Sequence, residues 1–171
     1  VTTWNPLLSE ITAMPNNTKV FDSSMIPGEI IDLLVVNSKT LSENPKLGKA
    51  LTGAWYEIMS TMKGSDKAAL AARTEMAEAS GTDLAGYDAQ LASTKMFFEA
   101  KDAVDFNNSS ALTTTMGKVA EFSFKHGLLG EGAADAKFIG VETPTGVYGD
   151  KSNIKLRFDP TYMQMAVDGK L

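Results

Sequence analysis

Two short stretches of the sequence combine residue types that bind small molecules. Trp4, Asn5 and Pro6 place an indole ring and an amide at the start of an expected helix. Such a pair offers an apolar wall and a directional hydrogen bond, as small-ligand pockets do. Ser23 and Ser24 follow an expected strand and supply hydroxyl and N–H groups at its carboxyl end, where open α/β sheets bind ligands. Ordinary packing of the tryptophan and a plain turn at the serines are the competing interpretations.

Residue types that carry enzyme or metal chemistry are scarce. His126 is the only histidine and there is no cysteine, so a Ser-His-Asp triad or a histidine metal site has at most one candidate member. We expect His126 at a helix end, where a cation is favourable, in a structural role. The glycines of residues 128–132 lack the preceding strand and the following Lys-Ser/Thr pair of a phosphate loop. We therefore predict no catalytic residue, metal or cofactor.

Composition and charge narrow the class of protein. Apolar residues make up 43% of the 171 residues and charged residues 22%, close to the averages of globular proteins. The net charge is −5 and the lysines are scattered, so nucleic acid is not an expected partner. The longest apolar run, residues 30–36, contains Asp32 and is far shorter than the roughly 20 residues of a membrane helix.

Helical spacing of apolar residues predicts several helices. Pro6 and Pro45 suit first helical turns, Asn44 suits an N-cap, and Gly81 and Gly127 suit helix ends. The expected helices cover residues 4–12, 45–64, 65–81, 84–93 and 111–125, with a short one from Asp159.

Short runs of apolar and β-branched residues predict the strands. We expect strands at residues 19–22, 138–142 and 154–158, and a strand or extended piece at 95–98. Residues 29–37 suit a strand that is buried on both faces, as in a parallel sheet. The sequence thus predicts an α/β protein with helices packed on a mostly parallel sheet.

Several stretches resemble one family of transport proteins. Residues 20–36 (VFDSSMIPGEIIDLLVV), with 44–51 and 54–57, resemble the substrate-binding proteins of the nitrate/sulfonate/taurine ABC-transporter superfamily, and most closely the subgroup encoded beside urea carboxylase. Residues 3–6, 128–132, 155–159 and 168–171 resemble further parts of the same proteins. The resemblance therefore covers essentially the whole chain.

The resemblance implies a two-lobed periplasmic-binding-protein fold of type II. Residues 1–28 would form the end of the second lobe and the return hinge crossing. Residues 29–171 would form the C-terminal part of the first lobe and the C-terminal helices. Members of the family are longer, so the N-terminal half and a signal peptide are expected outside this sequence, and the expected location is periplasmic.

The resemblance also implies a function without chemistry. The protein would capture a small polar solute by lobe closure and deliver it to an ABC permease of the inner membrane. Urea-, amide- or guanidine-like solutes are favoured, with sulfonates, taurine and nitrate as rivals. By position, Trp4, Asn5 and Pro6 would line the cleft, and the run from Asp22 through Ser23 to Ser24 would form the hinge floor.

Other functions and an assembly remain open at this point. The same fold serves enzymes that resemble thiamine-pyrimidine synthases, and it could serve a sensor that takes no part in transport. Strands that normally pair with the absent half would leave open edges, so we expect the chain by itself to dimerise or to swap elements.

Overall fold

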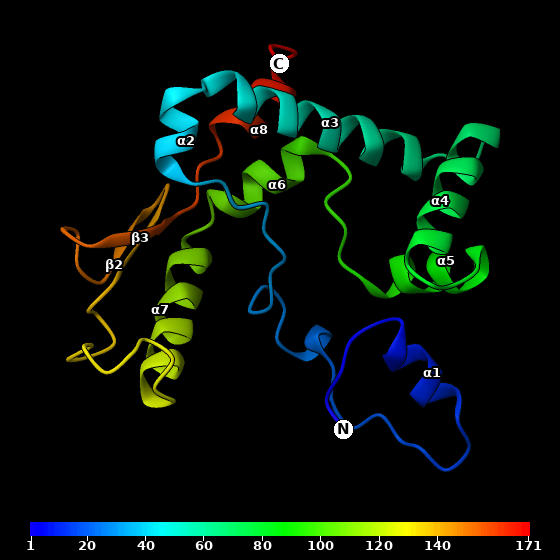
Figure 1. Ribbon diagram of the computed structural model, residues 1–171, viewed down its shortest axis with the longest axis horizontal. Coiled ribbons are helices and arrows are strands. Elements are labelled where there is room, and N and C mark those ends of the chain that lie inside the picture. The colour runs from blue at the N-terminus through cyan, green and yellow to red at the C-terminus, as the bar shows by residue number, and fades with distance from the viewer. The chain divides into compact units, whose positions relative to one another are not determined.

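The computed structural model describes residues 1–171, which form eight α-helices, one short 3₁₀-helix and three β-strands (Figure 1). The protein is therefore α/β and mostly helical. It divides into two compact units: residues 1–22 with 53–99 form the first unit, and residues 23–52 with 100–171 form the second. No helix combines the length and the apolar character that crossing a bilayer requires.

Four helices account for the first unit: α1 (Leu7–Ala13), the later part of α3 (Pro45–Lys63), α4 (Lys67–Ala79) and α5 (Leu84–Ser93). Two aspartates start helices here. Asp66 accepts a hydrogen bond from the Ala69 N–H at 2.8 Å, and Asp83 accepts one from the Gly86 N–H at 2.7 Å. These caps satisfy N–H groups that a helix leaves open. The four helices agree with the predicted ranges to within three residues at either end, the largest difference being the start of α1.

Arg73 joins three helices of the first unit. Its Nε lies 2.8 Å from Asp88 Oδ1 on α5. Its Nη1 donates to the carbonyl oxygens of Met62 and Gly64, each at 2.7 Å, where α3 ends. Because those carbonyls have no partner within the helix, the guanidinium substitutes for the missing donors and ties α3, α4 and α5 together.

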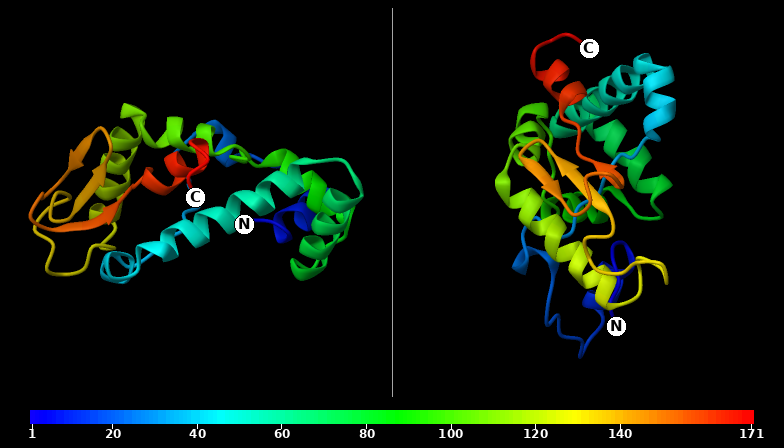
Figure 2. Two further views of the ribbon diagram at one scale, coloured as in Figure 1. Left: turned by 90° about the horizontal axis from the view of Figure 1, so that it is seen from above. Right: turned by 90° about the vertical axis from the view of Figure 1, so that its left-hand side faces the viewer.

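The second unit combines helices with a small mixed sheet. Strand β1 (Gly140–Thr143) lies between β2 (Gly146–Tyr148) and β3 (Ile154–Arg157), antiparallel to β2 and parallel to β3. Helix α7 (Ser110–Lys125) packs against β1 and β2 (Figure 2). The remaining elements are the 3₁₀-helix η1 (Ser23–Met25) and the helices α2 (Ser38–Glu43), α6 (Ala100–Asn107) and α8 (Thr161–Val167), of which α6 and α8 pack together.

A small core lies between α7 and the sheet. Leu112, Met116, Val141 and Phe158 are buried together. Ile31, Phe106 and Leu156 pack against this cluster while remaining partly exposed. Gly117 of α7 lies against the Tyr148 ring, where a Cβ atom would come within 2.9 Å of two ring carbons. A glycine here, despite its low helix propensity, lets α7 approach β2 closely.

Two strand predictions are wrong. Strands β1 and β3 overlap the predicted ranges 138–142 and 154–158, but residues 19–22 and 29–37 form no strand. Residues 95–98, expected as a strand or an extended piece, are not part of a strand. Residues 29–37 were expected to be buried, yet Ile30, Leu34 and Val35 are 66%, 61% and 68% exposed. A strand needs a neighbour that accepts and donates its ladder hydrogen bonds, and no other strand of the chain pairs with this segment. The observed sheet is mixed, rather than mostly parallel.

Candidate functional site

Trp4, Asn5 and Pro6 precede the first full turn of α1. The Trp4 carbonyl accepts the Leu8 N–H at 2.9 Å, which fixes the backbone, while the Trp4 side chain remains exposed at 81%. Asn5 Oδ1 accepts a hydrogen bond from the Ser9 hydroxyl at 2.8 Å. The local helix therefore uses the acceptor of Asn5 and leaves its Nδ2 donor group and the indole face accessible to a ligand.

Asp22 is held by a residue that the sequence interpretation overlooked. Lys19 Nζ lies 2.6 Å from Asp22 Oδ2, and both side chains are partly exposed. The pair places the Lys19 ammonium group beside the Asp22 carboxylate, so a ligand here would meet a hydrogen-bond donor as well as an acceptor. The sequence indicates this ion pair only by a lysine that lies three residues before an aspartate.

Ser23 and Ser24 lie in η1, where the Ser23 carbonyl accepts the Ile26 N–H at 3.1 Å. The connector therefore contains a single 3₁₀ turn. The six expected site residues are divided between the two units, because Trp4, Asn5, Pro6 and Asp22 belong to the first and the two serines belong to the second. A shared cleft for all six stays a prediction.

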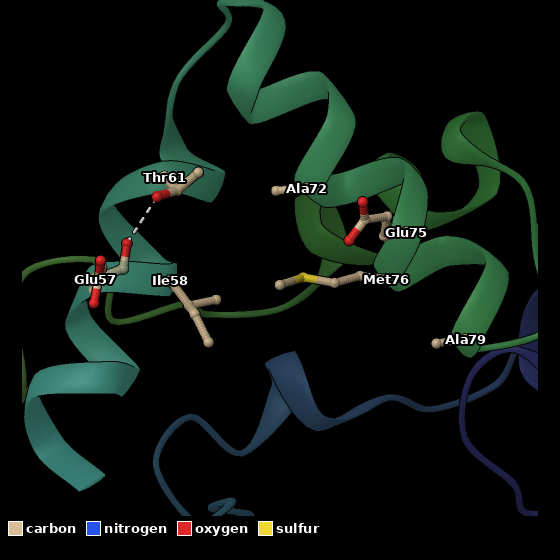
Figure 3. A pocket seen from close by; sticks show the side chains of 7 residues that line it. All are labelled: Glu57, Ile58, Thr61, Ala72, Glu75, Met76 and Ala79. Carbon is tan, nitrogen blue, oxygen red and sulfur yellow. Dashed lines mark hydrogen bonds between the residues drawn. The ribbon is translucent and has the colours of Figure 1, made fainter. Parts of the chain in front are cut away.

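An open groove in the first unit is lined by α3 and α4. It encloses about 470 Å³, and none of the six expected residues lines it. Figure 3 shows Ile58 and Met76 reaching toward the opening from the two helices. The Thr61 hydroxyl is already used, because it donates to the Glu57 carbonyl at 2.9 Å. The remaining lining residues are Ala72, Glu75 and Ala79.

Met76 differs in burial from three other methionines on the helices. Methionines at helical spacing normally fill a core, and Met59, Met62 and Met116 are buried. Met76 is only partly buried and lines the groove instead. With the carboxylates of Glu57 and Glu75 beside it, the groove combines an apolar floor with acidic edges.

A second groove, of about 430 Å³, lies beside α6 and α8 in the second unit. Its polar groups bind one another. Asp168 accepts hydrogen bonds from Gln164 Nε2 at 2.8 Å and from Lys170 Nζ at 3.0 Å. These two contacts, that of Gln164 first, lower the pKa of the Asp168 carboxyl below its ordinary value. The groove is also lined by Val104, Asn108, Pro160, Thr161 and Met165.

His126 lies at the end of α7, as predicted. Its ring is 4.2 Å from the Phe122 ring, centroid to centroid, and forms no hydrogen bond or ion pair with another side chain. Gly127 follows with φ of 71°, and the Leu128 N–H reaches back to the Ser123 carbonyl at 2.8 Å. This is a Schellman end, so the glycines after α7 begin a loop that terminates a helix.

Comparisons of the chain with protein-family models, with curated proteins and with solved structures found no match. The family expected from the resemblance therefore stays a proposal.

Proposed function

We propose that this chain is part of a periplasmic solute-binding protein of the nitrate/sulfonate/taurine ABC-transporter superfamily, with a two-lobed fold of type II. In this proposal it captures a small polar solute by lobe closure, performs no chemistry and passes the solute to a membrane permease. The resemblance of residues 20–36, 44–51 and 54–57 supports the family.

The exposed indole of Trp4 is the observation that carries the binding role. A tryptophan normally buries most of its large apolar surface, and leaving it in water forgoes about 25 cal/mol for each Å². Trp4 nevertheless keeps 81% of its surface exposed while its backbone is fixed by α1. An accessible aromatic face beside the Asn5 Nδ2 donor group is what a small polar ligand with a flat apolar side would use.

The Lys19–Asp22 pair favours a solute that both donates and accepts hydrogen bonds. Urea, short amides and guanidine-like compounds would donate to the Asp22 carboxylate, and a guanidinium would also suit the Trp4 face. An anion such as nitrate, taurine sulfonate or an alkanesulfonate would instead pair with the Lys19 ammonium group. Substituting Asp22 separates the two groups of solutes.

Single-tryptophan fluorescence tests the proposal. The chain has two tryptophans, so Trp55→Phe leaves Trp4 as the only reporter and Trp4→Phe leaves Trp55. We expect a saturable change in Trp4 emission with at least one of the solutes named above. Trp55 is also exposed and belongs to the same unit, so the Trp4→Phe protein is a matched control that should not respond. Equal responses of both reporters would contradict a site at Trp4.

The Asp22→Asn variant identifies the class of solute. A cation should lose affinity because its counter-charge is removed, whereas an anion should bind as before or more tightly because Lys19 is released.

The enzyme alternative makes a different prediction, namely turnover of a candidate solute that is lost in His126→Ala. The sensor alternative predicts solute binding while uptake is unchanged when the gene is deleted.

A further inference from the structure

Three stretches of the chain carry the Asn-x-Ser/Thr pattern at which N-linked glycans are attached. They begin at Asn16, Asn107 and Asn108. The pattern is only three residues long and also occurs by chance, so its structural context decides which asparagine can serve. An acceptor needs a free side-chain amide, a free hydroxyl two residues later, and a backbone that can leave the protein surface and enter an enzyme. These requirements separate the three sites.

Asn16 lies in an exposed turn directly after α1 (Figure 1). Its φ of 69° is left-handed, a conformation that asparagine tolerates better than most residues. The neighbouring Asn17 fastens the turn, because its Nδ2 donates to the Ile11 carbonyl at 2.8 Å. The side-chain amide of Asn16 forms no hydrogen bond, and every residue from 12 to 20 is exposed. The turn therefore presents the Asn16 amide to solvent.

Thr18 supplies the hydroxyl of the site that begins at Asn16. Its side chain is exposed and forms no hydrogen bond. Residues 17–20 belong to no helix or strand. Since surface loops of this kind give way more easily than the elements they connect, the segment can enter the active site of a transferase without breaking secondary structure.

The other two sites are closed by helices. Asn107 is the last residue of α6, and its Nδ2 donates to a carbonyl of its own helix at 2.8 Å. The hydroxyl of its site belongs to Ser109, which caps α7 by accepting a backbone N–H at 3.2 Å. For Asn108 the hydroxyl belongs to Ser110, the first residue of α7. Either asparagine could serve only after α6 or α7 had partly unfolded.

We propose that Asn16 is an N-glycosylation site that takes a sugar from a polyprenyl-diphosphate donor. In the transfer, Nδ2 of Asn16 bonds to the anomeric carbon of the sugar, and the bond from that carbon to the diphosphate oxygen breaks. The amide proton passes to a base of the transferase, and the diphosphate leaves with the bonding electron pair. The glycan adds a bulky, solvated group to the turn. The inference rests on the proposed function only for a location outside the cytoplasm.

Glycan transfer in vitro tests the site on the folded chain. The chain is incubated with a polyprenyl-diphosphate oligosaccharide and a purified single-subunit oligosaccharyltransferase that accepts the three-residue pattern, and its tryptic peptides are measured by mass spectrometry. The Asn16 site lies in peptide 1–19, and the other two sites share peptide 102–118. We expect the glycan on peptide 1–19 and at least about tenfold less on peptide 102–118, whose sites require local opening. No transfer to peptide 1–19, or equal transfer to both, would overturn the proposal.

Matched variants and free peptides test the reason for this choice. Thr18→Val removes the hydroxyl but keeps the shape of the side chain, so transfer to Asn16 should be lost, whereas Thr18→Ser should retain it. Thr18 is exposed, so both variants should fold. Synthetic peptides 1–19 and 102–118 should both accept the glycan, because helices this short are marginal in water. Transfer to Asn16 in Thr18→Val, or a free peptide 102–118 that stays unmodified, would overturn the proposal. Neither readout depends on solute binding, so failure of this proposal is distinguishable from failure of the proposed function.

Discussion

Removing the Arg73 guanidinium should destabilise the first unit more than removing any exposed charge there. Arg73 is 12% exposed in its side chain and donates to the carbonyls of Met62 and Gly64 as well as pairing with Asp88. The change Arg73→Met keeps the apolar stem and deletes all three contacts. It leaves the last carbonyls of α3 without their donor and a carboxylate without its cation.

The expected loss follows from these contacts. A hydrogen bond to a charged group contributes about 1.5–3 kcal/mol, and two such bonds reach the α3 carbonyls. Water can replace part of the bond to Gly64, which is exposed, and the Asp88 carboxylate is exposed enough that its pair adds only about 0–1 kcal/mol. We therefore expect Arg73→Met to lower the free energy of unfolding by about 2–4 kcal/mol.

Urea denaturation followed by tryptophan fluorescence measures this loss, since Trp4 and Trp55 both lie in the first unit. The midpoint should fall while the slope is unchanged. Lys63→Met is the matched control. The ion pair between Lys63 and Glu99, at 2.6 Å, is exposed and should contribute less than about 1 kcal/mol to the free energy of unfolding. Equal losses for Arg73→Met and Lys63→Met would show that the contacts of Arg73 contribute no more than an exposed ion pair.

Three further predictions concern the second unit. The Tyr148 hydroxyl is buried without a hydrogen-bond partner, so Tyr148→Phe should leave the melting temperature unchanged or raise it, and a clear fall would contradict this assignment. Gly117→Ala should lower the melting temperature although alanine favours helices by about 1 kcal/mol, because its Cβ would meet the Tyr148 ring at 2.9 Å; Gly132→Ala, in open space, is the control. Hydrogen bonds from the Ser152 side chain and then its N–H lower the pKa of Asp150, so the stabilisation that they give is present above the ordinary pKa and is lost as pH falls through the lowered one. Ser152→Ala should raise that pKa in an NMR titration, and an unchanged value would contradict the assigned cause.

The helices could be predicted because their signals are local. Helix α5 has the predicted range 84–93, and Pro45 starts α3 as expected. Helix α6 was not predicted. Only Ala103 and Val104 of its eight residues are buried, and two buried positions are too few to show a helical period in the sequence. Residues 29–37 were misjudged for the opposite reason. Their composition suits a buried strand, but strand formation depends on a neighbour that the local sequence does not specify.

The candidate site was less predictable than the helices. The residue types around Trp4 and Asp22 suggest binding. The exposure of the Trp4 indole and the ion pair between Lys19 and Asp22 depend on the folded chain and could not be predicted from residue types. The groove at Met76 was missed because a methionine at helical spacing normally fills a core. Sequence patterns identify candidate residues, and the chain around them determines which are accessible.

Thermal denaturation of the chain with each candidate solute tests whether the chain binds a solute. A solute present at a hundred times its dissociation constant should stabilise the protein by about 2.7 kcal/mol. For a chain of this size that corresponds to a rise of roughly 5–11 °C in melting temperature. We predict such a rise with a urea-, amide- or guanidine-like solute, or with a sulfonate, taurine or nitrate, and its loss in Trp4→Ala. An unchanged melting temperature with every one of these solutes would contradict the proposal that this chain carries a solute-binding site.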